Sequence, residues 1–280
     1  FMKKIIIKIL WHIARYLRIH AINRNLAFQN YLNILSENKK KNEKILLNYG
    51  YKNFSQADED GILEEIFKRI GTMNKTFIEI GVQDGYECNT LHLINQKWNG
   101  IWIEKEKKYC EKINKNFNFL INKHLEVIND EADTENINDL VQNKIKNQNN
   151  IDLLSIDIGL NTYHVLKKIN SISPRVIIVE YNAKFGPSAE WIIEYNKNVE
   201  WDNSNYFGAS LKSFEIMLKE KNYLLVGCNV TGVNAFFVRR DLINEKFIEN
   251  YSSEYHYQNK KEFLLKAFEN ENKVKIGRFE

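Results

Sequence analysis

The run of residues 76–85, TFIEIGVQDG, constrains the fold more than any other stretch of the chain. Its apolar, β-branched first half predicts a buried strand, which gives way at once to the turn residues Gly81, Asp84 and Gly85. A strand that ends in glycines before a helix places backbone N–H groups against a ligand at its carboxyl end. The stretch therefore predicts a cofactor site at the edge of an α/β sheet.

A second apolar run supports that prediction. Residues 100–104 end in Glu104, which lies 25 residues after Glu79 of the first strand. In a doubly wound sheet, a carboxylate at the end of the second strand accepts hydrogen bonds from ribose hydroxyls. We therefore expect the ligand to contain a nucleoside.

The turn after the first strand distinguishes between nucleoside cofactors. Gly81 and Gly85 are also explained by a tight strand-to-helix turn without any ligand, and the turn alone leaves both interpretations open. A dinucleotide site favours Gly-x-Gly-x-x-Gly, whose middle glycine makes room for a pyrophosphate, and Gln83 stands at that position. The turn favours a nucleoside without a pyrophosphate, and S-adenosylmethionine (SAM) is the commonest such cofactor on this fold.

The composition indicates a globular protein of a reducing compartment. With 280 residues, 44% of them hydrophobic, the chain can bury a sizeable core in one or two domains. Cys88, Cys110 and Cys228 are odd in number, widely spaced and outside any CxxC or Cys/His cluster. These spacings argue against a disulfide framework or a structural zinc site and favour the cytoplasm.

The positive charge is concentrated at the beginning of the chain. The net charge is +4, and six basic side chains precede the first acidic residue, Glu37: they are Lys3, Lys4, Lys8, Arg15, Arg18 and Arg24. Residues 37–280 therefore carry 34 basic and 36 acidic side chains. Because nucleic-acid phosphates require Lys and Arg across the binding face, we expect no nucleic-acid partner.

Residues 2–24 have the pattern of a basic amphipathic helix. At helical spacing, one face is an apolar stripe of Ile5, Ile9, Ile13 and Leu17. The opposite face is basic and carries Lys4, Lys8, Arg15 and Arg18. The charges exclude a membrane span. Packing on the domain, self-association with a second subunit and contact with an anionic inner membrane surface stay open. The predicted organisation is an N-terminal extension, 1–45, which ends in a solvated connection at 38–45, and a main domain, 46–280.

After residue 54, strands and helices alternate along the chain. A helix that reaches residue 67 is followed by expected strands at 76–80, 100–104, 125–128, 151–157 and 175–181, and by expected helices at 87–96, 107–117, 134–144, 161–169 and 208–221. This alternation predicts a doubly wound, mostly parallel sheet with helices on both faces. Two last strands, 223–228 and 232–239, form a C-terminal antiparallel hairpin, which SAM methyltransferases have and most dehydrogenases lack.

A series of motifs between about residues 51 and 242 carries a family resemblance. In chain order they are FSQADEDGIL (54–63), FIEIGVQDGYECNT (77–90), WIE (102–104), IDLLSID (151–157), VEYNA (179–183), FGP (185–187), YFGASL (206–211), VGCN (226–229) and NAFFV (234–238). Together they resemble the FkbM-like SAM-dependent methyltransferases, in particular the branch found in bacterial surface-glycan gene clusters. The resemblance implies that the main domain is a Rossmann-like class I methyltransferase.

The resemblance also implies where the cofactor is bound. Residues 56–60 are expected to close over it, Glu104 to hold the ribose hydroxyls, and the residues after the third strand to face the adenine. The full set of implied cofactor-binding residues is Gln56, Asp60, Glu79, Gly81, Asp84, Gly85, Glu104, Asn129, Asp130 and Asp157.

Asp157 and Glu180 are placed beside the transferred methyl group by the same resemblance. In-line methyl transfer needs surroundings that tolerate a sulfonium charge and a group that takes the acceptor proton, and carboxylates suit both roles. His164, one turn into the following helix, is a third candidate catalytic residue, although packing or capping is the stronger expectation for a lone histidine there.

The long segment after the fifth strand is the candidate substrate region. Its aromatic and polar side chains alternate in a manner that suits a sugar or another polar small molecule, although such a loop also covers a sheet edge. The candidate substrate-binding residues are Tyr181, Asn182, Lys184, Trp201 and Tyr206.

The loop after the fourth strand departs from the family pattern. The related branch has Ser-Ile-Asp-Ile-Asp-Gly-Asn-Asp-Tyr, whereas this chain has Gly159, Leu160 and Thr162 in place of an Asp, a Gly and an Asp. Two carboxylates are therefore missing beside the expected transfer centre. A metal site there loses its support, and we expect none.

The sequence thus predicts a cytoplasmic SAM-dependent methyltransferase that releases S-adenosylhomocysteine. O-methylation of a sugar or glycan precursor of the bacterial cell surface, such as capsule or lipopolysaccharide, is the leading hypothesis. A SAM-binding protein with reduced or lost catalysis is the alternative, because of the altered loop. A nicotinamide dehydrogenase is disfavoured by Gln83 and by the hairpin.

Overall fold

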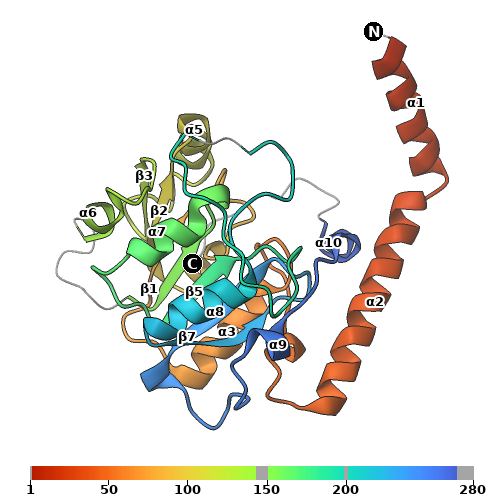
Figure 1. The fold of residues 1–280 in the computed structure, drawn as a ribbon. Coiled ribbons are helices and arrows are strands. Elements are labelled where there is room, and N and C mark those ends of the chain that lie inside the picture. Colours follow the sequence, from red (N-terminus) through yellow and green to blue (C-terminus); the bar gives the residue numbers. More distant parts are fainter. Residues whose placement is uncertain (1, 143–150, 199–200, 270–280) are drawn as a thin grey trace.

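The computed structural model describes residues 2–142, 151–198 and 201–269. A mixed β-sheet forms the centre of the domain, and helices cover both of its faces (Figure 1). Within the described residues the strand order is β3-β2-β1-β4-β5-β7-β6. The strands are β1 (Thr76–Ile80), β2 (Asn99–Glu104), β3 (Leu125–Asn129), β4 (Leu153–Ile156), β5 (Val176–Glu180), β6 (Tyr223–Cys228) and β7 (Asn234–Arg239).

The strand directions confirm the predicted fold class. β1 pairs in parallel with β2 and β4, β2 pairs in parallel with β3, and β4 with β5. β7 runs antiparallel between β5 and β6. This is the doubly wound, mostly parallel sheet with a C-terminal antiparallel hairpin of the Rossmann-like class I methyltransferase fold. Because the order reverses between β1 and β4, the loops after these strands diverge and leave a crevice at their carboxyl ends.

Alternate residues along the strands fill two separate cores. Phe77 of β1 and Trp102 of β2 belong to the core under α3, α4 and α5, whereas Ile78 and Ile103 belong to the core under α6, α7 and α8. Apolar side chains on both faces are expected of parallel strands covered on both sides. The helices are α3 (Glu59–Ile70), α4 (Leu91–Asn95), α5 (Lys107–Asn116), α6 (Ile137–Gln142), α7 (Thr162–Lys168), α8 (Leu211–Glu220), α9 (Ser253–His256) and α10 (Glu262–Phe268).

The helix after β1 is shorter than the sequence predicts. The expected helix at 87–96 begins only with α4 at Leu91. The backbone N–H groups of Asn89 and Thr90 donate to the carboxylate of Glu79 instead, at 2.9 and 3.0 Å. Because a side chain satisfies these donors, the chain can remain irregular up to residue 90.

The helix expected at 134–144 is also displaced at its beginning. It is α6, which begins at Ile137, because the Asp133 carboxylate accepts hydrogen bonds from the N–H groups of residues 135 and 136. Residues 143 and 144 lie outside the described part of the chain.

A long second helix precedes the domain, within the predicted helical extension 1–45 but continuing beyond the amphipathic pattern of residues 2–24. α2 (Ile19–Lys41) extends through residues 38–41, so the expected solvated connection at 38–45 is wrong for its first half. The apolar residues of α2 do not gather on one face, so no periodicity indicates the helix. Packing holds it in place: the Tyr31 ring lies edge-on to that of Phe268 in α10, with centroids 5.0 Å apart, and the Tyr31 hydroxyl donates to the Gly50 carbonyl. The division of the chain at residue 45 stays a prediction.

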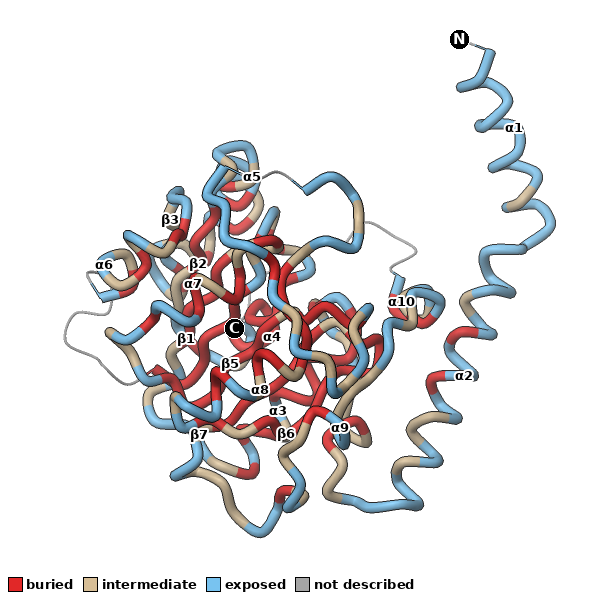
Figure 2. Tube along the Cα trace, in the orientation of Figure 1, coloured by how far each residue is buried: buried red, intermediate tan, exposed pale blue. Residues whose placement is uncertain are grey.

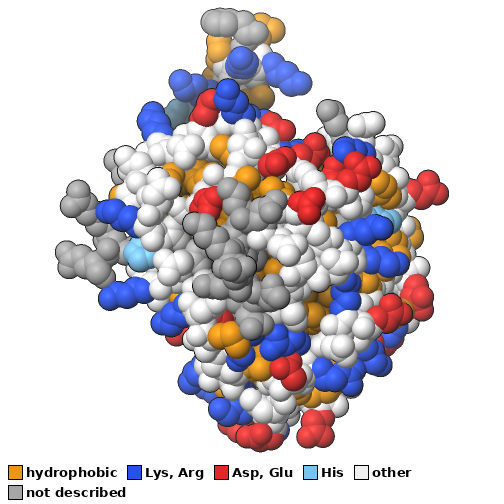
Figure 3. All heavy atoms as spheres, turned by 90° about the vertical axis from the view of Figure 1, so that its left-hand side faces the viewer, with side chains coloured by type: hydrophobic (Ala, Val, Ile, Leu, Met, Phe, Trp, Pro, Cys, Tyr) orange, Lys and Arg blue, Asp and Glu red, His pale blue; other side chains and the backbone are white. Residues whose placement is uncertain are grey.

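The predicted N-terminal helix is α1 (Met2–Tyr16), which projects beyond the domain (Figures 1 and 2). None of its residues is buried. Figure 3 shows Lys, Arg and hydrophobic side chains together on this segment where it rises above the domain. The described part of the chain therefore leaves the apolar stripe uncovered, so that, of the three alternatives, packing on the domain finds no support there.

Gly100 permits the close contact between β1 and β2. It pairs with Phe77, and a Cβ atom at Gly100 would lie 2.2 Å from the Phe77 ring. We expect Gly100→Ala to lower the free energy of unfolding by about 1–3 kcal/mol, because a packed ring has to move. Gly186→Ala is the matched control, since nothing lies within 4 Å of its added Cβ. Urea titration of both variants tests this, and equal stabilities would contradict it.

Candidate functional site

The carboxyl ends of the five parallel strands surround a cavity of about 550 Å³. Its wall contains Gly81 after β1, Glu104 of β2, Asp130 after β3, Asp157 after β4 and Glu180 of β5. The cavity lies where the strand order reverses, the usual place for a ligand in such sheets. Six predicted site residues are brought together here, these five and Trp201.

Gly81 allows the backbones after β1 and β4 to touch beneath the cavity. Its φ is +86°, and a Cβ atom would lie 1.8 Å from the carbonyl oxygen of Asp157. Its N–H donates to the carbonyl of Ile103 at 2.9 Å. Because only glycine tolerates both the dihedral angle and the contact, Gly81 has a structural cause in addition to any contact with a ligand.

Glu104 presents a fixed carboxylate to the cavity. Oε2 accepts a hydrogen bond from the N–H of Gln83 and Oε1 accepts one from the N–H of Glu106, both at 2.8 Å. The residue is only 5% exposed, yet it forms part of the cavity wall. The two backbone donors orient the oxygens, each of which keeps a lone pair for a ligand hydroxyl.

Asn129 supports this wall from outside the cavity lining. Its Nδ2 donates to the carbonyls of Glu104 and Lys105, both at 2.9 Å. These bonds join the end of β3 to the end of β2. They fix the position from which Asp130, the next residue, reaches the cavity.

Asp157 and Glu180 form a directly interacting pair of carboxyl groups in the wall. Asp157 is exposed at the cavity, and the protein atoms packed around its carboxyl group raise its pKa. Burial raises the pKa of Glu180 well above its ordinary value, the Asp157 charge raises it further, and the Lys260 ammonium opposes the rise. Glu180 is therefore the protonated partner, which donates a hydrogen bond to the Asp157 carboxylate.

Glu79 lies beneath the cavity and does not line it. Its carboxylate is buried and accepts hydrogen bonds from the N–H groups of Asn89 and Thr90, from the Thr90 hydroxyl and from the Ser155 hydroxyl. Burial raises the pKa of Glu79, and these donors oppose the rise. The residue joins β1, β4 and the turn at 81–90 into one unit.

Four more predicted cofactor residues lie outside the cavity lining. Asp60 is buried and accepts hydrogen bonds from the N–H groups of residues 53, 54 and 55, so it holds the loop before α3. Gln56 is exposed. Gly85 makes room for the Trp102 ring, which would lie 2.6 Å from an added Cβ, and Asp84 faces Lys112 at 3.9 Å. The structure does not bring these four residues to the cavity, and their roles stay predictions.

Residues 181–210, which we call the β5–α8 segment, contain the predicted substrate residues. Asn182 is buried, and its Nδ2 donates to the carbonyls of Asn205 and Phe207, both at 2.9 Å. The Tyr181 hydroxyl donates to the Gln258 carbonyl at 2.6 Å. Both side chains hold the segment in shape and do not line the cavity.

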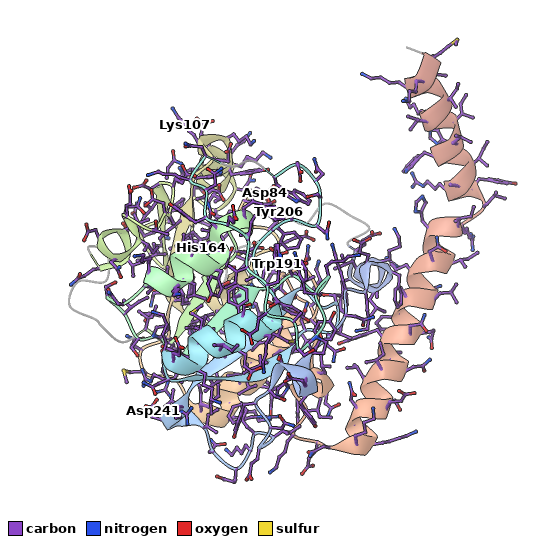
Figure 4. All side chains as sticks on the ribbon, in the orientation of Figure 1. Asp84, Lys107, His164, Trp191, Tyr206 and Asp241 are labelled. Carbon is purple, nitrogen blue, oxygen red and sulfur yellow. The ribbon has the colours of Figure 1, made fainter. Side chains whose placement is uncertain are left out.

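The exposed side chains of this segment differ in position. Lys184 is exposed and outside the cavity lining. Tyr206 packs edge-on against Trp191, with ring centroids 5.6 Å apart, and neither ring lines the cavity (Figure 4). Trp201 does line the cavity. Of the five predicted substrate residues, the structure thus brings Trp201 alone to the cavity.

The β5–α8 segment is tied across the cavity to the loop after β3. The Tyr195 hydroxyl accepts a hydrogen bond from Thr134, and Lys197 pairs with Asp133 at 2.5 Å and with Glu135 at 3.3 Å. Tyr195, Lys197 and Asp133 all line the cavity. These contacts join two walls whose loops are far apart in the sequence.

His164 does not reach the cavity. Its Nε2 lies 2.7 Å from the carbonyl oxygen of Ile193, and its ring lies edge-on to that of Tyr195, with centroids 5.4 Å apart. The residue sits on α7 and faces the β5–α8 segment (Figure 4). His164 supports that segment, in line with the expected packing role. It is not positioned to take a proton in the cavity.

The cavity lining also contains residues that were not predicted as site residues, among them Tyr109, Phe207 and Lys260. Lys260 lies beyond the part of the chain that carries the family resemblance, so no motif indicates it. Tyr109 lies on the polar helix α5, whose sequence gives no sign of a ligand. For the aromatic pair at 206 and 207, the sequence predicts Tyr206 rather than Phe207 as the substrate residue. Only the packing of the β5–α8 segment and of the C-terminal region decides which aromatic side chains face inward.

The cavity lining carries an excess of negative charge. Seven acidic and three basic residues line it: Glu104, Glu106, Asp130, Glu131, Asp133, Asp157 and Glu180, and Lys105, Lys197 and Lys260. Lys197 is already paired with Asp133. A cavity of this kind favours a ligand with a positive group and disfavours one with several phosphates.

No protein-family model and no curated protein sequence matches this chain. Solved structures align with it at low identity. A proposed caffeoyl-CoA O-methyltransferase from Staphylococcus aureus is 13% identical, over 75% of this chain and 99% of that one, with a TM-score of 0.48. The N-terminal domain of EvdMO1 with SAH bound is 12% identical over 74% and 94% (TM-score 0.42), and the glycopeptide N-methyltransferase MtfA complexed with sinefungin is 8% identical over 68% and 95% (TM-score 0.40). Because these scores are low, the strand order above, rather than the likeness, defines the fold class.

The raised pKa of Glu180 predicts a pH dependence of stability. The folded state keeps a proton that the unfolded chain loses above the ordinary pKa of 4.5, so this group's stabilising contribution falls as pH rises from there toward the folded-state pKa. For one proton the slope is at most about 1.4 kcal/mol per pH unit. Glu180→Gln keeps a hydrogen-bond donor and removes the titration. We expect the stability of this variant relative to the unaltered chain to increase with pH in urea titrations, whereas a pH-independent difference would disprove the assignment.

Proposed function

We propose that this protein is a SAM-dependent methyltransferase that methylates a hydroxyl oxygen. The observation that carries the proposal is Glu104, whose two oxygens are oriented by backbone N–H groups at the wall of an acidic cavity. A carboxylate at the end of β2 is where this fold holds a ribose. The predicted cofactor therefore has a suitable site among the residues present.

The charge of the cavity favours SAM over a dinucleotide. SAM carries a positive sulfonium, which suits the acidic lining, whereas the pyrophosphate of a dinucleotide needs backbone N–H groups at a helix N-terminus. Here the first helix after β1 begins only at Leu91, and Gln83 occupies the cavity wall. The chain therefore lacks the pyrophosphate site that a nicotinamide dehydrogenase requires.

The two ends of the cavity wall are formed by different residues. Glu104 would hold the ribose hydroxyls, and the loop with Asp130 and Asp133 would border the adenine. Gly81 and Asp157 lie toward the other end, where β1 and β4 touch. SAM supplies an electrophilic methyl group and leaves as S-adenosylhomocysteine once the acceptor oxygen has taken that group.

Asp157 and Glu180 are suited to the proton transfer that the acceptor requires. The acceptor oxygen forms its bond to the methyl carbon while the carbon–sulfur bond breaks, and its proton has to go to a base. Asp157, as the ionised member of the pair, accepts that proton. Glu180 holds the Asp157 carboxylate in place through its own hydrogen bond and keeps a negative charge from accumulating on both groups.

A sugar or glycan precursor of the bacterial cell surface is the proposed acceptor. Trp201 and Phe207 give the cavity aromatic faces beside the polar side chains of Asn161 and Lys260, a combination that suits a sugar. The cell-surface role rests on the family resemblance of the sequence. The three cysteines are free and buried, which supports a reducing compartment such as the cytoplasm.

A SAM-binding protein with reduced catalysis is the second candidate. Gly159, Leu160 and Asn161 line the cavity in place of the more acidic loop of related proteins. The altered loop is nevertheless ordered by its own contacts, because the Thr162 hydroxyl accepts a hydrogen bond from the N–H of Ile158 at 3.1 Å. The loop is thus ordered, although it lacks the two carboxylates of the family pattern.

Cofactor binding tests the first part of the proposal. We expect SAM and S-adenosylhomocysteine to bind the isolated protein in calorimetry and NAD not to bind. Glu104→Ala should weaken binding by about 1.5–3 kcal/mol, about 10- to 150-fold, because charge-assisted hydrogen bonds to the ribose are lost. Glu111→Ala, an exposed acid on the neighbouring helix α5, is the control and should bind normally. Unchanged binding by Glu104→Ala would place the ribose elsewhere.

Restoring the loop separates an enzyme from a binder. Gly159→Asp with Leu160→Gly and Thr162→Asp returns the two carboxylates. An added Cβ at Gly159 meets nothing within 4 Å, and its φ of +69° is a strained conformation that Asp adopts more readily than most residues. If catalysis has been reduced, the variant should gain methyl transfer by about 10²–10⁴-fold, the usual contribution of an acid or base, with SAM affinity changed only a few-fold. Methyl transfer to a panel of sugars, or release of S-adenosylhomocysteine, is the measurement. Rapid turnover by the unaltered chain and slower turnover by the variant would show that Asp157 and Glu180 suffice.

A further inference from the structure

The N-terminal part of the chain presents a long apolar surface that no described residue covers. Ile5, Ile9 and Ile13 of α1 are 44%, 53% and 48% exposed. Ile19, Ile22 and Leu26 in the first turns of α2 are exposed as well. Figure 2 shows α1 exposed along its length, whereas α2 is buried in places where it approaches α10.

The same part of the chain is strongly basic. Residues 2–36 contain six Lys and Arg side chains and no acidic one. In α1, Lys4, Lys8 and Arg15 lie on the face opposite the isoleucine stripe, and the Arg15 guanidinium lies 5.4 Å from the centre of the Trp11 ring. Figure 3 shows Lys and Arg side chains beside hydrophobic ones at the tip of the molecule.

No helix of the described residues is both long enough and apolar enough to cross a bilayer. An amphipathic helix with a basic polar face instead lies in the plane of the interface, with its apolar stripe among the acyl chains and its charges at the lipid headgroups. Tryptophan and arginine are favoured at that depth, since each combines an apolar or planar body with a polar group.

We propose that α1 and the first turns of α2 dock on a membrane surface that contains anionic lipids. Charge complementarity identifies this occupant: the exposed Lys4, Lys8 and Arg15 of α1 would meet phosphates at the headgroup level, and each attracts an anionic surface. The domain is then held at the membrane through α2, whose C-terminal half is fixed to the domain by Tyr31 and Phe268.

A second copy of the chain is the less suitable occupant. Two α1 helices paired along their isoleucine stripes would turn the basic faces of both copies outward, and residues 2–36 contain no acidic side chain to compensate them. The lipid surface satisfies the apolar stripe and the charge at once. A second helix satisfies the apolar stripe alone.

Flotation of the full chain with phospholipid vesicles tests the proposal. We expect the protein to float with vesicles of phosphatidylcholine and phosphatidylglycerol in equal parts, and to remain free with vesicles of phosphatidylcholine alone. Flotation should weaken with added salt, because screening shortens the range of the attraction. Lys4→Glu with Lys8→Glu and Arg15→Glu should lower binding at least about tenfold.

Matched variants distinguish the effect of the α1 charges from the effects of total charge and of helix formation. Lys39→Glu with Lys40→Glu and Lys123→Glu makes the same change of charge at exposed sites away from α1 and should bind as the unaltered chain does. Ile9→Gln with Ile13→Gln keeps a helix-forming residue at both sites and should also abolish flotation.

Light scattering on the same proteins checks for the competing occupant. The proposal expects the unaltered chain and Ile9→Gln with Ile13→Gln to have the same mass in solution. A dimer that this variant dissociates, together with no flotation of the unaltered chain, would assign the stripe to a second copy. Equal flotation of the α1 charge-reversed variant and its control would also overturn the proposal.

Discussion

The buried carboxylate of Glu79 is the contact on which the candidate site depends. It binds the N–H groups of Asn89 and Thr90 and the hydroxyl of Ser155, so β1, β4 and the turn between them are held by one side chain. The Thr90 hydroxyl in turn accepts a hydrogen bond from the indole of Trp102 in β2. Burying a charge costs desolvation free energy, which several hydrogen-bond donors have to offset. Here those donors belong to the elements that form the cavity floor.

The sheet then decides what gathers above that floor. Parallel strands direct their carboxyl ends to one edge, and the reversal of order between β1 and β4 opens a crevice there. Glu104, Asp157 and Glu180 come from three different strands and meet only for this reason. Their roles differ because their surroundings differ: backbone N–H groups orient Glu104, whereas the coupled Asp157 and Glu180 share one negative charge.

The β5–α8 segment and the N-terminal helices give this common fold its individual features. The segment is anchored by Asn182 and joined to the loop after β3 through Tyr195 and Lys197, so it confines the cavity from the side opposite Glu104. α2 is fixed to α10, and α1 extends freely from it. One chain thus combines a confined acidic cavity with an exposed basic helix.

The sequence by itself determined the sheet, because alternating apolar runs and glycine turns are local signals, and it determined Gly81 and Glu104 because each is tied to the end of one strand. It predicted a helical extension but not the course of α2, whose mixed faces are held to the domain by contacts such as those of Tyr31 with Phe268 and Gly50. It placed Glu79 at a ligand, since an acidic residue in a strand looks the same whether it faces a cavity or satisfies buried N–H groups. Only the tertiary structure decided which side chains of the β5–α8 segment face inward and that Lys260, near the end of the chain, reaches the cavity. The reason is that both depend on contacts between residues far apart in the sequence.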